Sequence, residues 1–119
     1  MPTFVTNLGL AILAGRMAGS GGEPVYIGWG TGSGQTASST GLAAEASESR
    51  VLGSSSVVTT DTTDDTYQVQ GTMVADADKS VTEVGLFTSG GTLFWYSDDY
   101  TKAVKAGDSV PFTLQTDFD

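Results

Sequence analysis

The chain has 119 residues, of which five are basic and fourteen acidic, so its formal net charge is −9. This length suffices for one hydrophobic core, and the charge opposes non-specific binding to nucleic acid or to anionic membranes, because both are themselves negative. The chain lacks cysteine and histidine, which excludes disulfide bonds, zinc sites with the usual ligands and Ser–His–Asp or Cys–His catalysis within this chain.

The remaining composition favours a mainly β protein. Sixteen glycines accompany a charged fraction of only 16%, and serine and threonine are frequent, which is typical of short strands and turns and not of a helical bundle. The N-terminus has no basic segment followed by a long apolar core. We therefore expect a soluble intracellular product without a signal peptide.

Residues 1–22 are predicted to form an N-terminal arm with one short helix. Thr6 or Asn7 is suited to cap this helix, its apolar residues recur at spacings of three and four, and Gly15 and the later glycines are predicted to end it. Such a helix lies across a sheet or clasps a neighbouring subunit. A helix at a membrane surface needs more basic residues than Arg16 alone.

A strand follows, with Val25, Ile27 and Trp29 on one face. The glycine-rich segment 28–36 invites comparison with a phosphate-binding loop, but it lacks the Gly-Lys-Ser/Thr of the P-loop and the spacing of the G-x-G-x-x-G motif. We interpret it as a flexible connection. Residues 41–45 are predicted to be briefly helical or irregular, with a weak capping box.

An acidic turn separates two extended stretches in the middle of the chain. Residues 50–52 begin an extended region, and residues 57–60 are typical of a strand. Asp61, Asp64 and Asp65 follow among threonines, and closely spaced carboxylates suit Ca²⁺. The D-x-[DN]-x-[DN]-G pattern ending in glutamate is missing, so the sequence favours a solvated turn.

The strongest signal in the chain is a predicted β-hairpin over residues 81–96. It comes after a half-buried strand at 67–75 and a turn at 76–80. Gly90 and Gly91 supply a tight turn, and four aromatic side chains lie between residues 87 and 96. Because no other segment offers as much area to bury, we predict that this hairpin lies at the centre of the sheet.

The C-terminal part is predicted to end in one long strand. Residues 98–105 suit a loop or a sheet edge, residues 106–108 a turn, and residues 109–118 alternate strictly between apolar and polar. Pro111 places part of that strand at an edge or a bulge. In total, six to eight strands predict a mainly β fold, a two-sheet antiparallel sandwich of jelly-roll type, with residues 23–119 as one domain.

Catalysis is not expected, and the sequence predicts no catalytic, cofactor-binding or metal-binding residue. Grouped carboxylates are the only acid–base groups, and each group lies in a predicted loop: Glu45 with Glu48, Asp61 with Asp64 and Asp65, Asp76 with Asp78, and Asp98 with Asp99. A chain of this length leaves little material for the cleft of a glycosidase. Trp29, Trp95 and Tyr96 offer a sugar-stacking surface for a carbohydrate-binding module, although large aromatics on strands are more often core or subunit contacts.

The order of several motifs resembles that of a group of small virion proteins of tailed bacteriophages. The motifs are T-N-L-G-L-A-I-L-A at residues 6–14, G-W-G-T-G at residues 28–32, the step from Ala43-Ala44-Glu45 to Arg50-Val51, V-T-E-V-G-L-F at residues 81–87 and G-D-S-V-P-F-T at residues 107–113. The resemblance covers nearly the whole chain. Trp29 departs from it, since a small or aliphatic residue is expected there.

Within that group, the chain is most similar to capsid decoration (cement) proteins. The resemblance implies binding to the outside of the head shell, with the major capsid protein as partner, and a dimer or trimer on a capsid symmetry axis, so that neighbouring capsomers are bridged. A tail, neck or tail-fibre component of the virion is the alternative. The candidate protein-contact residues lie in the N-terminal segment and in the loop after the first strand; they are Phe4, Leu8, Ile12, Arg16, Met17, Trp29 and Thr31.

Overall fold

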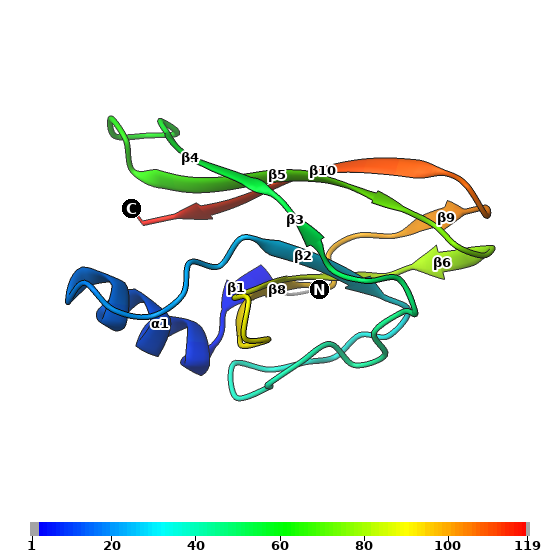
Figure 1. The fold of residues 1–119 in the computed structure, drawn as a ribbon, viewed down its shortest axis with the longest axis horizontal. Coiled ribbons are helices and arrows are strands. Elements are labelled where there is room, and N and C mark those ends of the chain that lie inside the picture. The colour runs from blue at the N-terminus through cyan, green and yellow to red at the C-terminus, as the bar shows by residue number, and fades with distance from the viewer. Residues whose placement is uncertain (1–2, 119) are drawn as a thin grey trace.

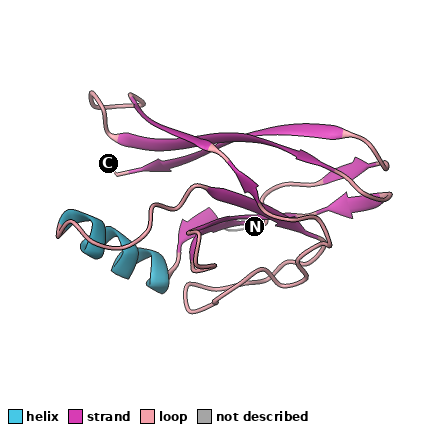
Figure 2. Ribbon diagram, viewed as in Figure 1, coloured by secondary structure: helices cyan, strands magenta, loops and turns pink. Residues whose placement is uncertain are grey.

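A computed structural model gives the fold of residues 3–118, which is mainly β, with antiparallel pairing in each sheet (Figures 1 and 2). The described residues form ten strands and one helix. The elements are β1 (Thr3–Val5), α1 (Asn7–Met17), β2 (Tyr26–Gly30), β3 (Val51–Leu52), β4 (Ser54–Val58), β5 (Thr66–Val74), β6 (Lys79–Val81), β7 (Glu83–Phe87), β8 (Leu93–Ser97), β9 (Lys102–Val104) and β10 (Ser109–Asp117).

The predicted hairpin is confirmed as the centre of the largest sheet. This sheet has the strand order β1-β8-β7-β2-β3, so β7 and β8 are both flanked by other strands. The turn between them is closed by a hydrogen bond from the Thr88 N–H to the carbonyl of Thr92. Gly91 in this turn has a φ of +89°, a conformation that favours glycine because it has no Cβ.

A three-stranded sheet, β10-β5-β4, lies over one face of the five-stranded sheet (Figure 1), and β6 and β9 form a separate pair. The two larger sheets share one hydrophobic core. Trp29 of β2 meets Phe112 of β10 edge to face at 6.0 Å between ring centroids, and Tyr67 of β5 meets Phe94 of β8 at 6.4 Å. Large aromatic side chains from both sheets thus hold the layers together.

The opposite face of the five-stranded sheet is covered by the irregular segment that connects β2 to β3 (Figure 1). Phe87, Leu93 and Tyr96 form a second buried cluster there, and Leu42 of the connecting segment packs against it. This explains why every residue of β7 and β8 is buried. The segment between β2 and β3, which includes part of the predicted flexible connection at residues 28–36 and all of residues 41–45, therefore serves as a third layer.

Helix α1 begins where the sequence predicts. The hydroxyl of Thr6 accepts a hydrogen bond from the Gly9 N–H at 2.9 Å and donates one to the carbonyl of Leu93 at 2.6 Å, so the N-cap also ties the helix to β8. Of the predicted stops, Gly15 lies inside the helix, which continues to Met17 as the apolar spacing predicted. Gly19, with a φ of +81°, follows the actual end.

Three further comparisons with the sequence-based predictions concern element boundaries. Ten strands replace the predicted six to eight, because β1, β6 and β9 have only three residues each and show little alternation. Residues 41–45 take the irregular one of the two predicted forms, since the chain there is held against β2 through a bridge between Gly30 and Glu45. Part of the predicted N-terminal arm is itself an edge strand, as residues 3–5 pair with β8.

Candidate interaction surface

A buried glutamate on β7, Glu83, holds the segment between β2 and β3, which we call the connecting segment, against the sheet. Glu83 is fully buried, and its carboxylate accepts four hydrogen bonds: from the backbone N–H groups of Gly32, Ala43 and Ala44 at 2.7–3.2 Å and from the hydroxyl of Tyr96 at 2.9 Å. Burial, followed by the contact with Glu83, raises the pKa of Tyr96, so its hydroxyl remains a donor. Glu83 thereby fixes the connecting segment to the sheet.

The glycines of G-W-G-T-G allow this segment to lie directly on the strand. A Cβ on Gly30 would come within 2.4 Å of both the Ala44 carbonyl and the Glu83 carboxylate, and one on Gly32 within 2.7 Å of the Ala43 side chain. Real Cβ atoms do not approach other atoms so closely. These glycines are needed for close backbone approach, as in other tightly packed loops.

A pair of cross-strand glycines makes room for a charged cluster on the same face. Gly28 and Gly85 are partners in the register of β2 and β7. Above Gly28, Arg50 forms two hydrogen bonds to Glu45, at 2.8 and 2.9 Å, and places its guanidinium 3.5 Å from the centre of the Phe87 ring, whereas Gly85 lies beneath Leu42 and Phe87. The sequence step from Glu45 to Arg50 is thus an ion pair that rests on an aromatic ring.

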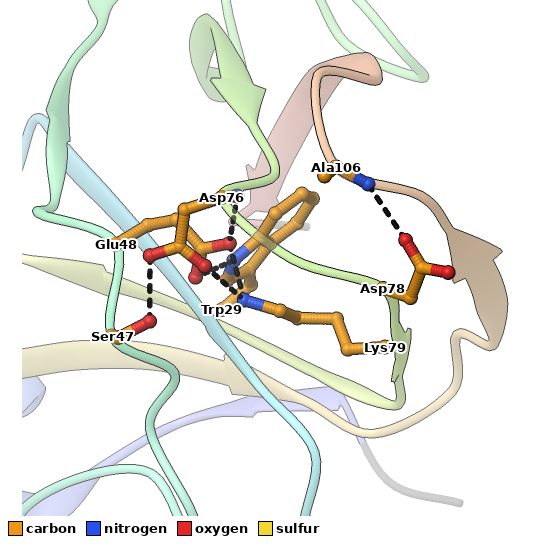
Figure 3. A network of polar contacts seen from close by, with 7 residues as sticks. All are labelled: Trp29, Ser47, Glu48, Asp76, Asp78, Lys79 and Ala106. Carbon is orange, nitrogen blue, oxygen red and sulfur yellow. Dashed lines mark hydrogen bonds and ion pairs between the residues drawn. The ribbon is translucent and has the colours of Figure 1, made fainter.

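A second polar network surrounds the indole nitrogen of Trp29 (Figure 3). The indole N–H donates to Oε1 of Glu48 at 3.0 Å, and Lys79 bridges Glu48 and Asp76, the latter at 3.0 Å. Burial opposes ionisation of Glu48, but hydrogen bonds from Lys79, Trp29 and the Asp76 backbone outweigh it and lower the pKa of Glu48 to about 2. Burial also acts against the charge on Lys79, whose pKa is nevertheless raised by Glu48 and Asp76.

Several carboxylates of the predicted groups bind cationic side chains or backbone N–H groups of the same chain. Glu45 and Glu48 bind different cations, Arg50 and Lys79. Asp78 accepts a hydrogen bond from the backbone N–H of Ala106 at 3.0 Å (Figure 3). The sequence missed these pairings and the role of Glu83, for which the one available signal was an acidic residue inside an apolar strand.

The acidic turn is organised by hydrogen bonds within the chain. The Asp65 carboxylate accepts from the backbone N–H groups of Thr60, Asp61 and Thr62 at 2.8–3.1 Å. Carboxylate oxygens of Asp61, Asp65 and Asp117 lie within 4.8 Å of one another, so the group differs from the predicted set, which contained Asp64. These contacts agree with a solvated turn.

Two interpretations of the aromatic residues require correction. Trp29, Trp95 and Tyr96 are all buried, with Trp29 only 1% exposed, so they form no sugar-stacking surface. Trp29 likewise offers no surface to a protein partner, although it was a candidate contact residue. Its ring belongs to the core and its indole N–H is bonded to Glu48.

The other candidate contact residues occupy different environments. Phe4 is partly buried and packs against Tyr96 with 5.5 Å between the ring centroids. Ile12 is partly buried against the core. Thr31 and Leu8 are exposed, and Met17 is 90% exposed. The structure therefore brings most of the exposed candidates together on α1.

Helix α1 has an apolar side that faces solvent. The side toward the body contains the buried Gly9 and the half-buried Ile12 and Leu13. The opposite side carries the polar, exposed Asn7 in the first turn, followed by the exposed residues that we call the α1 face, namely Leu10, Ala11, Ala14, Met17 and Ala18. None of them is charged. A helix that is apolar on both sides is normally buried on both sides.

Beside the helix lies an apolar groove of about 290 Å³, lined by α1, by β4 and β5 and by Phe94. Arg16, Glu23 and Asp64 are its charged lining residues. The Tyr67 hydroxyl on its wall donates to Glu23 at 2.9 Å. The groove lies on the body side of α1, where Ile12 and Leu13 line it, and the α1 face lies on the opposite side of the helix.

Within residues 3–118, no helix has the length and apolar content needed to cross a membrane. Comparisons with protein-family models, with curated proteins and with solved structures find no match to this chain.

Proposed function

We propose that this protein is a capsid decoration (cement) protein of a tailed bacteriophage. It binds the outside of the head shell and stabilises the shell by bridging neighbouring capsomers. It acts by binding and not by catalysis, and it contacts neither nucleic acid nor membrane. In this proposal the facing sheets form a jelly-roll-like sandwich. The protein is made in the host cytoplasm and is carried on the virion.

The α1 face is the observation that carries this proposal. Leu10 is 57% and Met17 90% exposed, on a chain whose composition otherwise keeps it soluble through acidic residues. A contiguous exposed apolar surface marks a site of contact with another protein. The sequence resemblance supplies the class of partner, the major capsid protein and further copies of this chain.

The contacts of the buried and partly buried charged side chains favour a binding function over catalysis. Glu83, Glu48 and Arg50 each contact groups of their own chain and thereby hold loops in place. Rigid loops suit a protein that repeats the same contact many times on a symmetric shell, where weak contacts add up. Thr31, exposed on the fixed connecting segment, lies where the shell contact is proposed.

Counting copies in purified virions tests the proposal directly. A decoration protein is present in hundreds of copies per particle, whereas a tail or neck component is present in few. Quantitative gel densitometry against the major capsid protein separates the two. A low copy number overturns the decoration assignment in favour of the tail or neck alternative, and absence from particles overturns both.

Particle stability supplies a second test. Particles that lack this protein are expected to release their genome at lower temperature and under milder osmotic or chelator challenge, and addition of the purified protein restores resistance. A Thr31→Arg variant is expected to restore less, with Thr72→Arg, an exposed threonine on β5, as the matched control. Unchanged release from particles without the protein contradicts the proposal.

A further inference from the structure

The groove beside α1 combines apolar walls with two carboxylates. Val57 and Phe118 line it and are 61% and 53% exposed, so part of its apolar surface faces solvent. Glu23 and Asp64 are also among its lining residues. Exposed apolar surface marks a contact site, and the charges around such a site select the sign of the partner.

The two carboxylates are not neutralised by an ion pair. The four ion pairs of residues 3–118 involve Glu45, Glu48, Asp76 and Asp78, and not Glu23 or Asp64. Arg16 also lines the groove, but its guanidinium donates to the carbonyl of Gly21 at 3.3 Å. The groove therefore has two acidic side chains whose charges an incoming cation can pair with.

Glu23 is held ionised at the wall of the groove. A hydrogen bond from Ser55 lowers the pKa of Glu23 more than burial raises it, and a hydrogen bond from Tyr67 and the charge of Arg16 act in the same direction as Ser55. The Tyr67 hydroxyl, 2.9 Å from the carboxylate, also orients it. A cation that excludes water from this half-buried position gains more than it would at an open surface.

We propose that the groove binds an extended segment of a different protein, in which a bulky apolar side chain is flanked by lysine or arginine. The apolar side chain enters between α1 and the joined ends of β4 and β5 (Figure 1), and the flanking cations contact Glu23 and Asp64. The inference deepens the proposed function, on which it rests for the setting, and there the segment belongs to the major capsid protein.

The size of the groove suits one anchoring side chain with its neighbours. Its volume of about 290 Å³ is at the lower end of the range of about 300–1,000 Å³ for pockets that hold drug-sized ligands. The buried Pro24 and Phe94 belong to its lining. A bulky side chain in an apolar pocket, surrounded by polar contacts that exclude water, is the usual form of a residue that dominates binding energy.

The charge of the chain makes a second copy a poor occupant. Each copy has a formal net charge of −9, and Arg50, Lys79 and Lys105 already form ion pairs within their own chain. A second copy would therefore bring mainly like charges to Glu23 and Asp64, whereas a segment with exposed basic side chains brings the opposite sign. The structure thus favours a different, basic partner.

The groove gives one copy a second contact region, apart from the connecting segment. Pro24 lines the groove shortly before β2 begins, whereas Thr31 directly follows the last residue of the same strand. The five residues of β2 span roughly 17 Å. Contacts near both ends of this strand allow one copy to touch two neighbouring subunits, as the bridging of capsomers requires.

Binding of synthetic peptides to the purified protein tests the inference. The probe is a heptapeptide, blocked at both ends, with leucine between two lysines and with glycine and serine elsewhere. One control peptide has serine in place of leucine, and the other has glutamate in place of both lysines. NMR chemical shifts of isotope-labelled protein measure affinity and locate the site.

The lysine–leucine peptide is expected to bind about fivefold more tightly than either control peptide, because both the apolar side chain and the cations contribute. The largest shifts are expected at the residues that line the groove, and the affinity is expected to fall as salt is added. Equal affinity for a control peptide, or shifts centred elsewhere, overturns the inference. Binding of phenethylammonium chloride without binding of the peptide also overturns it, in favour of a small organic cation.

Matched substitutions assign the two contributions to the groove. Asp64→Asn is expected to weaken binding about threefold, while Asp99→Asn, the same change at an exposed site outside the groove, leaves it unchanged. Asp64 has a φ of +58°, which asparagine tolerates equally well. Val57→Thr is expected to weaken binding, with Val74→Thr on β5 as its control. Equal effects of a variant and its control overturn the inference.

A substitution at Arg16 tests the sign of the occupant's charge. Arg16→Gln removes the cation that lines the groove, and binding of the lysine–leucine peptide is expected to become about twofold tighter. An anionic occupant predicts the opposite change. Circular dichroism confirms that each variant is folded, and weaker binding by folded Arg16→Gln protein contradicts the inference.

Failure of this inference is distinguishable from failure of the proposed function. Peptide binding is measured on the purified protein alone, whereas copy number and genome release are measured on particles. A groove that selects the lysine–leucine peptide in a protein absent from virions supports the binding site and removes the decoration function. A protein abundant on virions whose groove does not select that peptide retains the function and loses the binding site.

Discussion

The β7–β8 hairpin and helix α1 are both strongly apolar, yet their surroundings differ. Each residue of the two strands of the hairpin is buried, because one face packs on the three-stranded sheet and the other is covered by the segment between β2 and β3. The helix buries one side, whereas Leu10 and Met17 on its other side remain exposed. The chain supplies partners for all of the hairpin and for half of the helix.

This difference shows how a small domain distributes its stability and its capacity for assembly. Side chains whose partners lie within the chain contribute to the free energy of folding. Apolar side chains without such partners contribute little to folding and are available for a neighbouring molecule. Substitutions in the two regions are therefore expected to affect different measurements.

The largest expected effect comes from comparing a buried residue of the hairpin with an exposed residue of α1. Phe94→Ala removes a buried ring that packs on Tyr67, and we expect it to lower the free energy of unfolding by about 3–5 kcal/mol. Met17→Ala is expected to change it by less than about 0.5 kcal/mol. Urea denaturation followed by tryptophan fluorescence measures both. A comparable loss for Met17→Ala would show that the helix side is buried within the chain.

A substitution at Glu83 tests whether one carboxylate holds the connecting segment over the hairpin. Glu83→Gln replaces an acceptor of four hydrogen bonds by an amide whose NH₂ group faces backbone donors, at an expected cost of about 2–3 kcal/mol. The control is Glu45→Gln, which weakens a partly exposed ion pair and is expected to cost less than about 1 kcal/mol. Equal losses in denaturation experiments would remove the special role of Glu83.

A substitution at Gly30 tests whether the connecting segment needs a glycine on β2 in order to lie directly on that strand. Gly30→Ala places a Cβ 2.4 Å from a backbone oxygen of Ala44, and the required shift is expected to cost about 2 kcal/mol. Gly41→Ala, whose Cβ would meet nothing within 4 Å, is expected to be neutral within about 0.5 kcal/mol. Hydrogen exchange of the Ala44 N–H should accelerate in the first variant only; slow exchange in Gly30→Ala contradicts the explanation.

The smallest expected effect concerns pH. The pKa of Glu48 is about 2 in the folded protein and near its usual value of about 4.3 when unfolded. Its stabilising contribution is therefore present above about pH 4.3 and is lost as the pH falls toward 2. Thermal unfolding of wild type and Glu48→Gln is expected to differ by about 1–2 kcal/mol at pH 7 and to converge at pH 2. A constant difference across this range would show that the ion pair with Lys79 contributes nothing.

Local signals in the sequence predicted much of the fold. The Thr6 cap, the glycine turn of the hairpin and the alternation of residues 109–118 each depend on neighbours within a few positions, and the structure confirms all three. Pro111 was correctly placed on an edge strand, since β10 pairs on one side only. The helix ends just before Gly19, one of the predicted stops, and runs through Gly15, because a single glycine weakens a helix without ending it.

The candidate site was predicted only in part. The sequence placed contact residues on the helix, and Met17 and Leu8 are exposed there. It also counted Trp29 as a contact residue. The sequence around an aromatic residue at the end of a strand does not reveal whether another layer of the fold will cover that residue. The layer that covers the outer face of the sheet comes from residues 31–50, which have no regular periodicity.

The sequence by itself determined that the protein is acidic, mainly β and free of cysteine and histidine, because composition and short-range alternation fix these properties. Only the tertiary structure decided that Glu83 binds three backbone groups about 40 to 50 residues away and that one side of α1 is left exposed by residues 3–118. Both depend on contacts between segments distant in sequence, and such contacts are set by how the layers pack and not by the residues beside them.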